Sequence, residues 1–301
     1  MNKELKIITT DVGESTAKTY TNSYKRLRKL LNMTDKRKPI NKLPLNEVLD
    51  VINSVENASS RHAVYIIATK VYNFVDNKDA FETVRQGINK DKREHQKTKN
   101  HKLTASLPTY KEINDAIKKE TDPRKYITSF IIFKIQTRNM DVALIDIHAN
   151  KKDKYDENRN HLILDENKVI YIRNKYKTVK KYGQKKNIIK VKKFTEKVKE
   201  FLGDNEMKTM FTQRNGNHIS PASTASYLKK YIVLGLNEGQ VIKAVIRNVE
   251  ENGDYNVLRR ISANRGTTLQ LLLTEYDISN LSEPTEVITQ NQDVKQKVSI
   301  E

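Results

Sequence analysis

The chain has 301 residues, and its 56 lysines and arginines exceed its 37 aspartates and glutamates to give a formal net charge of +19. At roughly 150 residues per domain this length predicts two domains, and the surplus of positive charge favours a polyanion such as nucleic acid as the partner. The absence of cysteine excludes disulfides and thiolate metal sites. No apolar run reaches the roughly 20 residues that span a bilayer and no signal-like start is present, so we expect a cytoplasmic protein without a metal, cofactor or membrane partner.

The first 88 residues predict a small helical domain. Apolar and aromatic side chains recur with a helical period in several segments, namely 15–31, 45–56, 59–75 and 79–89. The first of these helices carries a basic face, which we expect to contact DNA through Lys25, Arg26, Arg28 and Lys29.

The next segment, 89–105, predicts a basic linker. Its sequence NKDKREHQKTKNHK (89–102) contains almost no apolar residue and cannot bury a core. It is interpreted either as a solvated tether or as a strap that lies along phosphates, and the two are compatible.

Residues 106–279 predict a second domain, followed by a polar tail at 280–301. A helix at 107–120 precedes an apolar stretch at 125–145. The period then changes to that of β-strands, separated by turn signals, in three segments: 161–165, 168–178 and 185–193. Helical periodicity returns in the segments 194–202, 221–234, 238–251, 254–264 and 268–276. The fold class is therefore mainly α with a small three-stranded antiparallel sheet (α+β).

The strongest DNA-binding signal lies between the last two strands. From Ile170 to Lys193 there are ten basic residues and no acidic one, with tyrosines interleaved. Such a ribbon repels itself unless an anion is present, and it can neutralise phosphates along a groove. The expected DNA contacts are Arg173, Lys175, Lys177, Lys180, Lys181, Lys185 and Lys186.

The order of these elements resembles that of the tyrosine recombinase (phage integrase) family over roughly residues 10–280. IIFKIQTRNMDVALIDI resembles the first active-site box, which places Arg138 at the first catalytic arginine and Asp141 at the acidic position. NKYKTVKKYGQKKNIIKV resembles the hairpin of the catalytic lysine, with Lys177 as the best match. ENGDYNVLRRISANRGTTLQLLLTEY resembles the closing segment, with Tyr276 at the position of the nucleophile. The resemblance implies two domains that clamp a DNA duplex.

The family chemistry explains these residue types. A tyrosine phenolate attacks a phosphodiester and forms a covalent intermediate, arginines hold the non-bridging oxygens, and the hairpin lysine with His or Trp groups manages the protons. Arg138 is thus interpreted either as a phosphate contact or as the partner of Asp141 in a structural ion pair. Tyr276 is either a nucleophile or a packing residue at the end of an apolar helix.

This chain departs from the family pattern after residue 218. No histidine follows His218, and the chain has no tryptophan. The family's second box normally reads His-x-x-Arg, and a later position is His or Trp. Anchoring the second box on Gly253 puts Ile242 at its arginine, whereas a deletion of about five residues places Arg247 there. Effects of active-site groups are not additive, but the loss of these groups predicts that strand cleavage is gone.

The sequence thus predicts a sequence-specific double-stranded DNA-binding protein that can self-associate on DNA. The resemblance implies a transcriptional regulator of a phage or mobile element, such as the recombinase-fold repressors of SPbeta-type phages. Two alternatives stay open: an active recombinase that cleaves and rejoins DNA through Tyr276, and an architectural protein that bends DNA.

Overall fold

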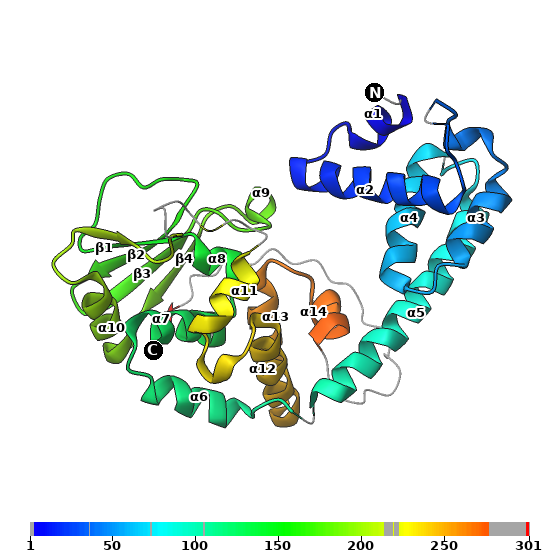
Figure 1. Cartoon of the computed structure of the whole chain (residues 1–301). Coiled ribbons are helices and arrows are strands. Elements are labelled where there is room, and N and C mark those ends of the chain that lie inside the picture. The colour runs from blue at the N-terminus through cyan, green and yellow to red at the C-terminus, as the bar shows by residue number, and fades with distance from the viewer. Residues whose placement is uncertain are drawn as a thin grey trace. The chain divides into compact units, whose positions relative to one another are not determined.

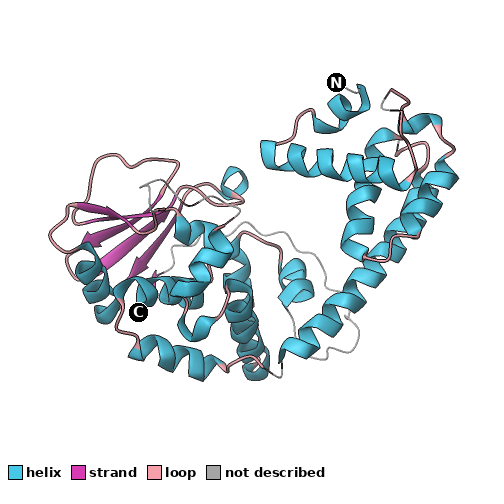
Figure 2. Cartoon of the chain, viewed as in Figure 1, coloured by secondary structure: helices cyan, strands magenta, loops and turns pink. Residues whose placement is uncertain are grey.

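The structure, a computed structural model, describes residues 3–35, 37–72, 74–104, 106–213, 219, 223–276, 299 and 300. The chain divides into two compact units, an N-terminal unit (Met1–Lys99) and a C-terminal unit (Asn100–Glu301) (Figure 1). Both contain many helices, whereas the sheet belongs to the C-terminal unit (Figure 2).

The N-terminal unit is helical. Its elements are α1 (Lys3–Thr9), α2 (Glu14–Leu30), the 3-10 turn η1 (Ile40–Lys42), α3 (Leu45–Asn53), α4 (Ala58–Val71) and most of α5 (Lys78–Thr104). The apolar periodicity predicted α2, α3 and α4, whose inward side chains form the core with Phe81 of α5. Helix α1 was not predicted, and a buried carboxylate holds it in place. Glu4 accepts hydrogen bonds from the Tyr24 hydroxyl (2.8 Å) and from the backbone N–H groups of Ile40 (2.9 Å) and Asn41 (3.0 Å).

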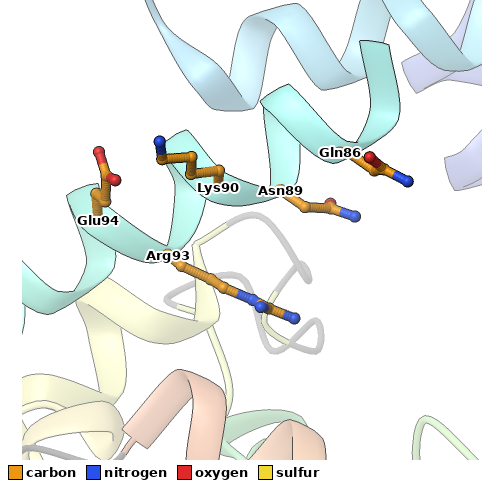
Figure 3. A pocket seen from close by; sticks show the side chains of 5 residues that line it. All are labelled: Gln86, Asn89, Lys90, Arg93 and Glu94. Atoms are coloured by element: carbon orange, nitrogen blue, oxygen red, sulfur yellow. The ribbon is translucent and has the colours of Figure 1, made fainter. Parts of the chain in front are cut away.

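Most of the segment predicted as a basic linker is helical. Residues 89–104 form the continuation of α5, which begins at Lys78. Lysine, glutamate and glutamine are good helix formers, so a segment too polar for a core can still be a helix. Gln86, Asn89 and Arg93 extend from one side of α5, with Lys90 and Glu94 on another, and together these exposed side chains line a hollow of about 390 Å³ (Figure 3).

The apolar stretch at 125–145 is the core of the C-terminal unit, but it is not one element. It contains α7 (Pro123–Phe130), a π-helical turn η2 (Ile131–Ile135), α8 (Asn139–Ala143) and the start of a strand. Before it, α6 (Tyr110–Lys119) begins with a capping box between Thr109 and Glu112. The π-helical turn ends at Gln136, whose backbone is left-handed (φ 55°) and turns the chain towards Arg138.

The sheet is larger than predicted and mixed. Strands β2 (Asn160–Asp165), β3 (Lys168–Arg173) and β4 (Lys185–Ile189) form the expected antiparallel set. The expectation of three strands is corrected by β1 (Ile145–His148), parallel to β2, by β5 (Met207–Thr209), antiparallel to β1, and by β6 (Ser299–Ile300), parallel to β4. The order is β5-β1-β2-β3-β4-β6. The α+β class holds.

Helices cover this sheet and complete the unit. Helix α10 (Lys192–Leu202) packs on the sheet and on α7 (Figure 1). The later elements are α11 (Thr224–Leu228), the 3-10 turns η3 (Lys229–Tyr231) and η4 (Val233–Gly235), α12 (Glu238–Asn252), α13 (Tyr255–Arg265) and α14 (Leu269–Tyr276). Helices α12 and α13 end at left-handed glycines, Gly253 and Gly266.

No helix in the described ranges is both long enough and apolar enough to cross a membrane.

A pair of histidines lies buried between β1 and β2. The Nε2 atom of His148 lies 3.0 Å from Nδ1 of His161, whose Nε2 is 2.9 Å from the backbone oxygen of Asp156. The ring of Tyr155 packs against both imidazoles. Burial lowers the pKa of His148 to about 4 and also lowers that of His161, so both rings are neutral at physiological pH.

Candidate nucleic-acid interface

The connection between β3 and β4 is an ordered basic turn. It contains the short helix α9 (Val179–Tyr182) and ends at Gly183, whose φ of 65° favours glycine. The Tyr176 hydroxyl donates to the Gly183 oxygen at 2.6 Å and so closes the turn. The turn is therefore a shaped surface.

The turn carries a group of exposed cations, here called the hairpin lysines (Lys175, Lys177, Lys180, Lys181 and Lys186). Within the described part of the chain, no carboxylate oxygen lies within 4.0 Å of any of their ammonium groups. Their mutual repulsion is thus not offset by an internal acid, and an external anion would relieve it.

Two other cations of the hairpin, Arg173 and Lys185, have side chains that point towards the interior of the unit. Arg173 and Lys185 face each other as the last residue pair of β3 and β4, an arrangement that is unfavourable for like charges. The Arg173 side chain is fully buried, and its Nη1 donates to the Asn264 oxygen (2.7 Å) and lies 3.3 Å from Asp141 Oδ2. The Lys185 ammonium donates to the Ala263 oxygen. Both positive charges therefore meet the negative carboxyl end of α13, where a helix favours cations.

This placement changes the expected set of DNA contacts. Arg173 has no exposed surface, so it cannot reach a phosphate in this conformation. Lys185 is half-buried, and burial together with the charge of Arg173 lowers its pKa to about 8. These two residues fasten the hairpin to α13.

A close contact between Gly266 and the Thr178 side chain also holds the hairpin against α13. Gly266 follows α13 and lies against Thr178, the residue before α9, so closely that a Cβ at position 266 would collide with the Thr178 Oγ1 atom. Residues 263–266 thus hold the hairpin through two cations and one close contact.

Arg138 and Asp141 lie beside this junction. Arg138 is half-buried just before α8, and its backbone N–H lies 3.5 Å from Asp141 Oδ2. Burial raises the pKa of Asp141, although the charges of Arg173 and Arg138 favour the carboxylate. The charge of Arg138 also lowers the pKa of Lys185. The fold therefore brings together Arg138, Asp141, Arg173 and Lys185. The sequence placed Arg138 and Asp141 in the first active-site box and gave Arg173 and Lys185 as DNA contacts.

The two candidates for a second arginine lie elsewhere. Ile242 is fully buried in the apolar core on α12. Arg247 pairs along the same helix with Glu251, and its Nε lies 2.9 Å from Oε1. The Arg247 side chain is 36% exposed and that of Glu251 is 59% exposed.

Sequence reasoning missed Arg265, a buried arginine that lies near the first box. Its Nη2 is 2.6 Å from Glu238 Oε1, and its Nη1 donates to the Thr137 oxygen at 3.2 Å. Glu238 also accepts from the Asn139 N–H at 2.7 Å. Arg265 thus joins the start of α12 to the loop before α8. The signal available in the sequence was its place in the last turn of α13, before Gly266.

Two further candidates are Lys177 and Tyr276. Lys177 is exposed in the basic turn. Tyr276 is the last residue of α14, and its side chain is outside the described part of the structure.

In the N-terminal unit, the cations of α2 also divide into two kinds. Lys25, Arg26 and Lys29 are exposed, and Arg26 donates to the Ser60 hydroxyl at 2.9 Å. Arg28 is buried: its Nη1 donates to the Lys38 oxygen at 2.6 Å and its Nη2 to the Asp35 oxygen. Arg28 therefore anchors the segment after α2, whereas its neighbours remain available to a partner.

Comparisons with known proteins identify no family. No known family and no curated protein sequence matches the chain. A solved structure described as the crystal structure of XerA recombinase is similar with a TM-score of 0.33 and 11% identity, covering 92% of each chain.

Proposed function

We propose that this protein binds double-stranded DNA through the hairpin lysines and the exposed cations of α2, as a sequence-specific regulator built on the plan of a tyrosine recombinase. The observation that carries the proposal is the group of five exposed lysines, which have no carboxylate partner among the residues that the structure describes. Cations placed in this way release counterions when they meet phosphates, and this release supplies much of the free energy of DNA binding.

The fixed shape of the basic turn supports a DNA ligand over a diffuse polyanion. Contacts at Ala263, Asn264 and Gly266 hold the turn against α13, so the lysines occupy defined positions. Fixed phosphate contacts set the position of a protein along a duplex. Contacts to the bases require this position to be defined. The second contact of the proposed clamp is the exposed face of α2 with Lys25, Arg26 and Lys29.

The state of the family's other catalytic positions supports a binder that does not cleave DNA. The position aligned with the second arginine is the apolar Ile242, and Arg247 is paired with Glu251. No histidine after His218 and no tryptophan is present to move protons. We therefore assign a role in transcriptional regulation, as a repressor of a mobile element.

The alternative is an active recombinase that cleaves DNA through Tyr276. One observation favours it. Burial and the charge of Arg173 lower the pKa of Lys185 to about 8, and the charge of Arg138 also acts on this ammonium group. A lysine with such a pKa can donate a proton to a leaving oxygen near neutral pH.

The test of DNA binding compares two quadruple variants with the same change in charge. Lys177, Lys180, Lys181 and Lys186 are replaced by Gln in one. Exposed lysines of α6 and α10 are replaced in the control, namely Lys111, Lys119, Lys192 and Lys199. Lys185 is kept in both because it holds the hairpin to α13.

Fluorescence anisotropy measures the affinity for a labelled duplex at several salt concentrations. At roughly 0.9 per phosphate contact, the hairpin variant should flatten the log–log salt slope by about 3 to 4. The control should change it much less. Equal salt slopes in the two variants would show that the hairpin lysines do not contact the DNA.

A further inference from the structure

Tyr182 differs from the other tyrosines of the hairpin. Tyr171 is fully buried, and Tyr176 is 6% exposed with its hydroxyl bonded to Gly183. The Tyr182 side chain, at the end of α9, is 44% exposed. Burial in the core therefore explains the first two tyrosines but not the third.

Cations flank the ring of Tyr182. The ammonium of Lys181 lies 5.2 Å from the ring centroid and that of Lys185 lies 5.3 Å from it. The ring and the hairpin lysines thus form one surface, in which an aromatic face stands among groups that can bind phosphates.

The ring is also held in place. Backbone hydrogen bonds close α9 onto Thr178, from Lys181 N–H at 3.0 Å and from Tyr182 N–H at 3.1 Å. The ring lies beside Gly266, since a Cβ built there would be 3.6 Å from Tyr182 Cδ2. A rigid ring loses little conformational entropy when it makes a contact.

An exposed aromatic ring among lysines has the chemistry of a platform for nucleobases. Bases stack on aromatic side chains regardless of their identity, because every base presents a π-face. In an intact duplex these faces are covered by neighbouring base pairs. They become available only where a base is unpaired or a step is opened.

The geometry points to Tyr182 as a base-stacking residue that directs the hairpin to duplex DNA with a locally unstacked base. The hairpin lysines hold the phosphates around that base, and the ring covers its exposed face. This inference rests on the proposed function, since it assumes that the hairpin meets DNA.

The experiment measures affinity for two duplexes of the same sequence, one fully paired and one with a single-nucleotide bulge. The variants are Tyr182→Leu, which removes the π-face, and Tyr182→Phe, which keeps it. Tyr255→Leu is the control, because Tyr255 is 65% exposed on α13 and lies outside the basic turn. Circular dichroism and thermal unfolding check that each variant is folded.

The wild type and Tyr182→Phe should bind the bulged duplex about tenfold more tightly than the paired one. Tyr182→Leu should lose this preference and keep both the affinity for the paired duplex and the salt slope. Tyr255→Leu should behave as the wild type. A wild type without preference, or a preference that survives in Tyr182→Leu, overturns the inference while leaving DNA binding intact. If the wild type binds neither duplex, the proposed function itself fails.

Discussion

Gly266 lies against Thr178, so the residue that ends α13 and the residue that precedes α9 are in direct contact. The contact joins a helix terminus to the basic turn across a long separation in sequence. Glycine is required at 266 for two reasons, its left-handed backbone (φ 59°) and the lack of space for a Cβ.

Gly266→Ala should therefore destabilise the protein more than Gly253→Ala does. Gly253 is also a left-handed glycine at the end of a helix (φ 70°), but a Cβ there has open space around it. Gly253→Ala, the control, should lower the unfolding free energy by about 1–2 kcal/mol through backbone strain alone. Gly266→Ala should lower it further because the new Cβ collides with Thr178. Urea unfolding measures both. Adding Thr178→Ala to Gly266→Ala removes the colliding Oγ1 and should restore part of the loss. Equal costs for the two glycines would mean that the contact does not constrain the hairpin.

Arg28 and Lys29 are neighbours on α2 with opposite expected roles. Arg28→Ala removes hydrogen bonds to the oxygens of Asp35 and Lys38 and should cost roughly 2 to 3 kcal/mol of stability. Lys29→Ala, at an exposed position, should change stability by less than about 0.5 kcal/mol and weaken DNA binding. Thermal unfolding and anisotropy titrations separate the two effects. A stable Arg28→Ala protein that has lost DNA affinity would reverse these roles.

The histidine pair predicts a loss of stability in acid. Because the pKa of His148 is about 4 in the folded protein and near 6.5 when unfolded, the unfolded state binds more protons between these values. Unfolding free energy should therefore fall as pH decreases from about 6.5 to about 4, by at most about 3 kcal/mol from this residue. The measurement is urea unfolding followed by circular dichroism across this range. His148→Gln should flatten the pH dependence, whereas His95→Gln at an exposed position of α5 should leave it unchanged. A dependence that persists in full in His148→Gln would assign the effect to other groups.

Tyr276→Phe separates the two proposed functions. The substitution removes the oxygen through which a covalent intermediate would form and keeps the ring. For a regulator, DNA affinity and activity in cells should be unchanged, and a suicide DNA substrate should give no covalent adduct with the wild type. Arg138→Ala should then reduce affinity only partly. An adduct with the wild type that disappears in Tyr276→Phe would establish the recombinase instead.

Much of the secondary structure follows from local patterns. Apolar residues at helical spacing predicted α2, α3, α4, α6, α10 and α12 to α14, and β-branched segments with turn signals predicted β2, β3 and β4. The single helix predicted over 221–234 was wrong, because its described residues form the short α11 and the 3-10 turns η3 and η4. Strand β1 was missed because it continues an apolar stretch without a change of period. Its pairing with β2 is made across an intervening loop and leaves no local signal. The polar part of α5 was predicted as a linker because its composition cannot bury a core. A segment that buries no core can still form a helix.

The sequence by itself determined that the chain is basic, that its cations gather in α2 and in the hairpin, and that late histidine and tryptophan are absent. Only the tertiary structure decided which of those cations face outward. Arg173 is buried because Asp141 and the Asn264 oxygen, 32 and 91 residues away in the chain, meet its guanidinium. Arg28 is buried because the loop after α2 folds back and offers its carbonyl oxygens. A cation leaves water only where partners offset the cost of desolvation. The partners of Arg173 come from distant segments that no local pattern specifies, and those of Arg28 come from the fold of the adjoining loop.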